Sequence, residues 1–113
     1  MTLVRGLVPI VTQSASRTVS VDNTAPTVAI TSPANGASLF LSATLQASAS
    51  DNAGVTQVVF YDGGNVIGTD TSAPYSLSWN VLGVSKGTHT LTARAYDVAG
   101  NVTLSAPVSV KVL

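Results

Sequence analysis

The stretch from Gly87 to Val112 constrains the fold of this chain most strongly, because its apolar side chains recur at every second position. In its first half, four such side chains alternate with polar or amphipathic ones, as in a half-buried β-strand: His89, Leu91, Ala93 and Ala95. The residues Ala99-Gly100-Asn101 then favour a chain reversal. Apolar residues at the even positions from 102 to 112 predict a second strand, which Pro107 places at a sheet edge or a bulge because proline lacks a backbone donor. The stretch is therefore predicted to form a long antiparallel hairpin.

Five shorter segments upstream show the same alternation or a dense apolar run, and turn residues separate them. They are predicted to be strands over residues 27–31, 39–50, 55–61, 66–70 and 75–80. Val58 and Val59 lie on opposite faces of the third segment, which places it in mid-sheet, and Trp79 is predicted to be the largest core side chain. No segment shows helical periodicity. We therefore predict an all-β fold, a seven-strand β-sandwich, with an up-and-down barrel as the alternative.

The composition limits the classes of function that the chain can have. Its 113 residues suffice for one domain with its own core. The absence of cysteine excludes disulfides, zinc–thiolate sites and cysteine nucleophiles. The 5 basic residues are balanced by 5 acidic ones, all aspartate, so no positive surface is available for nucleic acid or an anionic membrane. No apolar run approaches the roughly 18 residues of a membrane span, and we expect neither nucleic-acid binding nor membrane insertion.

The sequence of the first 23 residues indicates that they do not belong to the domain that follows them. The segment from Ser14 to Val21 aligns without gaps on Ser105 to Val112, with the serine, the alanine and both valines matching. This echo predicts that residues 1–23 hold the last strand of a preceding repeat and a linker, and that the domain covers residues 24–113. A signal peptide is the weaker alternative, because the apolar run near the start is short and is broken by Pro9.

Several motifs carry a resemblance to a known family. They are DNTAPTVAITSPANGASL, ASASDNAGV, VVFYDGGNVIGTD, PYSLSWNV and GTHTLTARAYDVAGN. The chain resembles the bacterial immunoglobulin-like domains that occur in tandem in secreted enzymes, adhesins and surface proteins, and the resemblance covers Thr24 to Val112. It implies a seven-strand immunoglobulin-like or fibronectin type III-like sandwich, an extracellular location in a secreted or cell-surface protein, and neighbouring domains as partners. It also implies a spacer or presenting role.

Aspartate and asparagine residues fall in turns that an alternating sandwich brings to one pole. Counting strand reversals places two of these turns where the first strand starts, so that four side chains can converge there: Asp22, Asp51, Asp97 and Asn101. Their oxygen atoms are the hard ligands that calcium prefers. The alternative is that each residue shapes its own turn, which the absence of a dense Asp-x-Asp loop favours. Calcium is the one cofactor for which the sequence offers a site.

Residues suited to catalysis are scarce. His89 is the only histidine and there is no glutamate, so no acid–base pair or Ser-His-Asp motif is recognisable, and we expect no enzyme activity. Tyr61 and Tyr96 are predicted to point outward, where a tyrosine pair can stack on a sugar ring or anchor a partner protein. The sequence therefore predicts a non-catalytic structural spacer. The alternative is an adhesive module that binds a polysaccharide or a surface protein and is rigidified by calcium.

Overall fold

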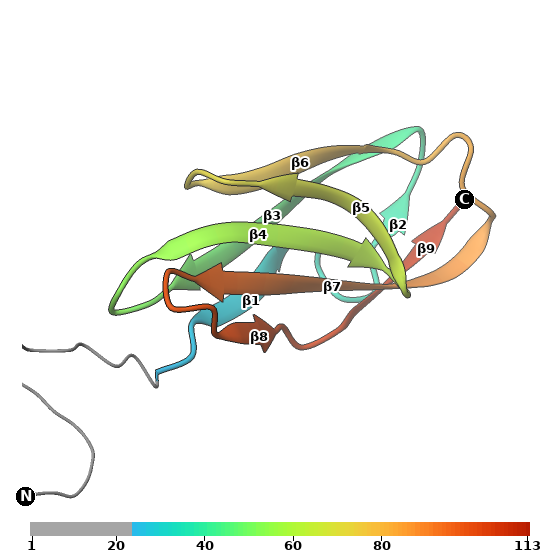
Figure 1. Ribbon diagram of the computed structural model, residues 1–113. Coiled ribbons are helices and arrows are strands. Elements are labelled where there is room, and N and C mark those ends of the chain that lie inside the picture. The colour runs from blue at the N-terminus through green and yellow to red at the C-terminus, as the bar shows by residue number, and fades with distance from the viewer. Residues whose placement is uncertain (1–23) are drawn as a thin grey trace, which may run out of the picture.

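The computed structural model describes residues 24–113, and the expected remnant strand, the linker and Asp22 lie outside the described residues. The described chain forms two β-sheets that face each other (Figure 1). The strands are β1 (Thr27–Ser32), β2 (Ser38–Leu39), β3 (Ser42–Ser50), β4 (Val55–Asp62), β5 (Asn65–Asp70), β6 (Tyr75–Asn80), β7 (Gly87–Asp97), β8 (Val102–Leu104) and β9 (Val108–Val112). Within this range, no helix has the length and apolarity that crossing a membrane requires. The predicted all-β sandwich is confirmed.

The two sheets differ in size and share no strand. The smaller sheet has the order β1-β3-β6, and the larger has the order β2-β9-β7-β4-β5, with β8 also paired to β7. β2 and β9 run parallel, and the other pairs of neighbouring strands are antiparallel. β7 and β4 lie inside the larger sheet, so the strand predicted for mid-sheet is in mid-sheet.

The core lies between the inner faces of the two sheets, where the alternating apolar side chains meet. Leu45 and Trp79 of the smaller sheet belong to the same buried cluster as Phe60 and Leu91 of the larger sheet. Removing a side chain of this size from water stabilises the fold by about 1.5–3 kcal/mol. The period-two pattern of the sequence therefore supplies the core, and Trp79 lies in it as predicted.

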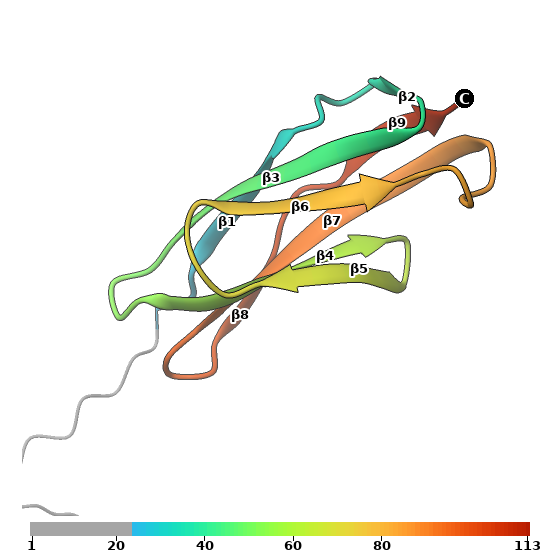
Figure 2. The same ribbon diagram turned by 90° about the horizontal axis from the view of Figure 1, so that it is seen from above.

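The segment predicted as one strand over residues 39–50 is divided between the two sheets. β2 ends at Leu39 in the larger sheet, and β3 begins at Ser42 in the smaller one. Phe40 and Leu41 carry the chain from one sheet to the other (Figure 2), and Leu41 has a positive φ of 68°. The single-strand prediction was wrong because alternation of side chains does not say which sheet a strand joins.

The predicted final strand over residues 102–112 is also two strands, and its apolar side chains do not share one face. The register against β7 shifts by one residue between β8 and β9. Such a shift turns the side chains to the opposite face of the sheet. Val102 and Leu104 are therefore exposed, whereas Val110 is buried. Pro107 lies in the break between the two strands, consistent with its missing backbone donor.

Candidate functional site

The loops at the end of the sandwich where the described chain begins, here called the N-terminal pole, bring two predicted turns side by side. The backbone N–H of Val98, just after β7, donates to the carbonyl of Gly54, just before β4, at 3.2 Å. The side-chain Nδ2 of Asn101 donates to the carbonyl of Thr24 at 3.3 Å. The loop after β3, the loop after β7 and the start of the described chain therefore meet at this pole.

Asp97 and Asn101 bind each other across the turn between β7 and β8. Oδ1 of Asp97 accepts the backbone N–H of Asn101 at 2.7 Å, and Oδ2 accepts the side-chain Nδ2 of the same residue at 2.9 Å. Asp97 is only 3% exposed, and a buried carboxylate needs such bonds because losing its hydration is costly. These contacts close the turn, which is the structural role that the sequence offered as the alternative to calcium binding.

Asp51 lies in the neighbouring loop and is less completely bonded. Its Oδ2 accepts the backbone N–H of Ala53 at 2.9 Å, whereas its Oδ1 is buried and has no hydrogen-bond partner. Within residues 24–113, no three acidic or histidine side chains gather closely enough to hold a metal ion. A calcium ion at this pole would therefore need backbone carbonyl and amide oxygens as well, and Asp22, the fourth candidate, lies outside the described residues.

A tyrosine and arginine cluster lies on the outer face of the larger sheet. Cζ of Arg94 on β7 is 4.8 Å from the centre of the Tyr61 ring on β4, a cation–π distance. Tyr96 lies two residues further along β7, and burial followed by a hydrogen bond with Tyr96 raises the pKa of Tyr61. The structure thus brings the two predicted tyrosines together. Sequence reasoning missed Arg94, which covers one face of the Tyr61 ring.

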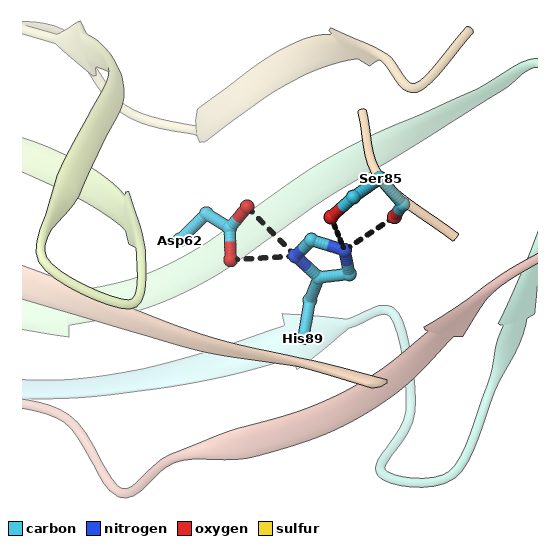
Figure 3. A network of polar contacts seen from close by, with 3 residues as sticks. All are labelled: Asp62, Ser85 and His89. Atoms are coloured by element: carbon cyan, nitrogen blue, oxygen red, sulfur yellow. Dashed lines mark hydrogen bonds and ion pairs between the residues drawn. The ribbon is translucent and has the colours of Figure 1, made fainter. Parts of the chain in front are cut away.

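At the opposite end of the sandwich, His89 lies between Asp62 and Ser85 (Figure 3). Its Nδ1 is 2.9 Å from Oδ2 of Asp62, and its Nε2 is 2.6 Å from the carbonyl oxygen of Ser85. A carboxylate and a carbonyl oxygen both accept hydrogen bonds, so the protonated imidazole, in which both ring nitrogens donate, satisfies both partners. The hydrogen bond to Ser85, and after it the one to Asp62, raises the pKa of His89. The sequence identified His89 but neither of these partners.

These three residues are of the types found in a Ser-His-Asp triad, but they are not arranged for catalysis. Oγ of Ser85 is 3.4 Å from Nε2 of His89, while the carbonyl oxygen of the same serine is nearer, at 2.6 Å, and accepts the hydrogen bond of this nitrogen. A general base must direct an unprotonated nitrogen at the nucleophile. The part of the chain that the structure describes also encloses no pocket for a substrate. Through His89, these hydrogen bonds instead connect Asp62 at the end of β4 with Ser85 in the segment before β7.

Comparison with known proteins adds what the geometry alone does not give. Residues 26–93 match the family described as Bacterial Ig domain, which is more than half of the chain. The chain belongs to the bacterial Ig domain family. The expected resemblance is thereby confirmed. The fold of this Ig domain also matches the fibronectin(III)-like modules of Clostridium thermocellum CbhA, with a TM-score of 0.70 and 30% identity over 76% of this chain and 94% of that one.

Two other similar proteins are much longer than this Ig domain. Halomucin of Haloquadratum walsbyi is 38% identical over 84 residues, which are 73% of this chain and 1% of Halomucin. An endo-β-1,4-mannanase from Thermotoga petrophila matches with a TM-score of 0.64 and 14% identity, over 81% of this chain and 20% of the enzyme, and this likeness shows the fold alone. The match to 1% of Halomucin shows that a similar domain occurs within a much larger chain.

Proposed function

We propose that this Ig domain is a non-catalytic spacer that holds neighbouring domains apart in a larger secreted or cell-surface protein. The observation that carries the proposal is the position of the two ends of the domain. The described chain starts at the N-terminal pole, and Leu113 lies at the other end of the sandwich (Figure 1). Domains attached at opposite poles are separated by the length of the sandwich. The similarity to small parts of Halomucin and of the mannanase supports a modular role.

The strand order supports a spacer that bears tension along its length. β9 carries the C-terminal end and lies between β2 and β7. The N–H of Lys111 donates to the carbonyl of Ala37 at 2.8 Å, and the N–H of Leu113 donates to that of Leu39 at 2.9 Å. Ladder hydrogen bonds run across the strands. A force between the poles therefore loads these bonds together in shear.

Single-molecule pulling in two directions tests this role, and the chain has no native cysteine to interfere with attachment. The pair Thr24→Cys with Leu113→Cys pulls between the two poles. The matched pair Gly64→Cys with Leu113→Cys attaches the handle to the β4–β5 turn, which lies at the same end as the C-terminus (Figure 1). A force between these two sites separates β9 from its neighbours one hydrogen bond at a time, starting at the end of the strand. We expect a clearly higher unfolding force between the poles. Equal forces in the two directions would contradict a mechanical function.

An adhesive or polysaccharide-binding module is the second candidate. It is favoured by a continuous set of side chains on the outer face of the larger sheet: Tyr61, Arg94, Tyr96, Val102 and Leu104. In the pairing of β7 with β8, Val102 lies opposite Tyr96 and Leu104 opposite Arg94. Aromatic rings beside exposed apolar groups are suited to contact a sugar or a protein. Loss of polysaccharide or partner binding in a Tyr61→Ala, Tyr96→Ala double variant would support this candidate, and retained binding would exclude this face.

A calcium ion at the N-terminal pole is a separate proposal, supported by the buried and unpartnered Oδ1 of Asp51. An ion that binds only the folded domain raises its melting temperature. We compare melting in a chelator with melting in millimolar calcium, for the unaltered chain and for Asp51→Asn. A rise that the substitution removes would support the site. Identical melting temperatures in the unaltered chain would exclude a calcium site within this domain.

A further inference from the structure

Large apolar side chains gather at the end of the sandwich opposite the N-terminal pole. They belong to Phe40, Leu41, Leu82 and Leu113, which are 65%, 49%, 70% and 50% exposed, and we call them the C-terminal apolar cap. The N–H of Val81 donates to the carbonyl of Leu41, and the N–H of Leu113 donates to that of Leu39, both at 2.9 Å. The three segments that carry the cap are therefore bonded to one another, and Figure 2 shows them at one end.

The backbone at Leu41 is strained, although the side chain that it carries is half exposed. Its φ of 68° and the 2.8 Å hydrogen bond from the N–H of Ser42 to the carbonyl of Phe40 define a γ-turn with positive φ, a rare and strained form. At every other described position with positive φ, the residue is glycine. A sparsely populated backbone conformation of this kind costs a residue with a side chain about 1–3 kcal/mol. A leucine here therefore lowers stability while keeping an apolar side chain in the cap.

Two lysines lie near the cap. Nζ of Lys86 donates to the carbonyl oxygen of Leu113 at 3.0 Å, and Lys111 of β9 lies opposite Ser38 of β2. Asp62 also lies at this end, and His89 beside it balances its charge when the imidazole is protonated. The cap end thus presents an apolar surface with lysines at its margin.

The N-terminal pole has the complementary character. Val98 extends from the loop after β7 and is 68% exposed. Asp51 lies in the adjacent loop, and Asp70 ends β5 on the same side of the domain, where it accepts the N–H of Ser72. Among the residues that the structure describes, this pole therefore combines an exposed apolar side chain with acidic groups, opposite in sign to the two lysines near the cap.

We propose that the C-terminal apolar cap docks on the N-terminal pole of a second Ig domain of the same kind and makes a stiff head-to-tail joint. The inference rests on the proposed spacer function, because it names the surface through which the spacer meets its following neighbour. Leu113 is itself part of the cap, so a domain attached after it starts beside this surface. Contact between two different surfaces of like domains extends into a rod, as a spacer requires.

The full chain at rising concentration tests this docking. Two domains linked in one polypeptide meet at an effective concentration in about the millimolar range, so a contact with a dissociation constant in that range suffices for the joint. Between separate molecules, the same contact forms only at high protein concentration. We follow amide NMR signals from about 0.05 to about 5 mM. Signals around Phe40 and Leu82 are expected to shift together with those around Val98. The double variant Phe40→Ser, Leu82→Ser is expected to lose the shifts at both poles.

A matched control distinguishes docking at the cap from nonspecific association through exposed apolar side chains. Leu104→Ser removes a leucine that is 55% exposed but lies on β8, away from the cap, and it is expected to leave the shifts unchanged. No concentration dependence, shifts confined to another face, or shifts that survive the cap substitutions would overturn the docking. The spacer function is tested separately, by the pulling measurement. If the domain resists force between its poles but shows no docking, the spacer proposal stands and only the docking proposal fails.

Discussion

At the scale of single residues, His89 couples the stability of the domain to pH. Its pKa is raised on folding by the carbonyl of Ser85 and then by Asp62, so protonation favours the folded state. This contribution is fully present below the unfolded pKa of about 6.5 and is lost as the pH rises through the higher folded pKa. We expect the free energy of unfolding, measured with urea, to fall as the pH rises from about 6.5 through the raised folded pKa of His89. Asp62→Asn is expected to lose about 1–2 kcal/mol at the lower pH and to flatten the fall.

Asp70 provides the control for this measurement, because it acts on the acid side. The backbone N–H groups of Ser76 and then Ser72 lower its pKa. Its contribution is therefore present above the unfolded pKa and is lost as the pH falls through the folded pKa. Asp70→Asn is expected to reduce the loss of stability in acid and to leave the alkaline fall intact. A stability that does not change on the alkaline side of the unaltered chain would contradict a cationic His89.

A substitution at Leu41 is expected to weaken docking while changing the stability of the domain little. Asparagine tolerates the left-handed region better than leucine does, so Leu41→Asn relieves strain while removing an apolar side chain from the cap. We expect the free energy of unfolding to stay within about 1 kcal/mol of the unaltered value. The concentration-dependent NMR shifts are expected to weaken in the same variant. A large loss of stability would instead show that Leu41 is held by packing within the domain.

At the scale of elements, Ser105 joins the break between β8 and β9 to the central strand β7. Its side chain is buried, and its Oγ accepts the N–H of Ala93 at 2.9 Å, where a ladder bond is missing. Ser105→Ala leaves that buried donor unpaired and is expected to cost about 1–3 kcal/mol in urea unfolding. The matched change Ser109→Ala, on the exposed face of β9, is expected to have little effect. Equal effects of the two changes would contradict this role of Ser105.

The same elements show how far the sequence predicts the fold and the site. Alternation is a local property, so it located the strands, the core position of Trp79 and the outward orientation of Tyr61 and Tyr96. The crossing of the chain at Leu41 and the register shift near Ser105 depend on partners distant in sequence, which a local pattern does not specify. The pairing of His89 was missed for the same reason. Only the register of β4 against β7, which places Asp62 opposite Leu91, brings its carboxylate near the histidine.

At the scale of the whole molecule, the lysines at one pole and the aspartates at the other favour docking of unlike poles over docking of like poles. Exposed ion pairs contribute about 0.2–1 kcal/mol each and are screened by salt, whereas apolar contact is not screened. We therefore expect the double variant Lys86→Gln, Lys111→Gln to weaken self-association by about two- to fivefold at low salt. The variant is also expected to lose most of the salt dependence that the unaltered chain shows.

The exposed Arg94 supplies the matched control, because it carries the same charge on the side of the sandwich rather than at a pole. Arg94→Gln is expected to leave the dissociation constant and its salt dependence unchanged, as measured by the same NMR titrations. Deprotonation of His89 leaves Asp62 unbalanced at the cap end, so association is also expected to weaken as the pH rises through the folded pKa of this histidine. Association that is equally strong at all salt concentrations, or that Arg94→Gln weakens as much as the lysine changes do, would contradict a joint oriented by the charges of the poles.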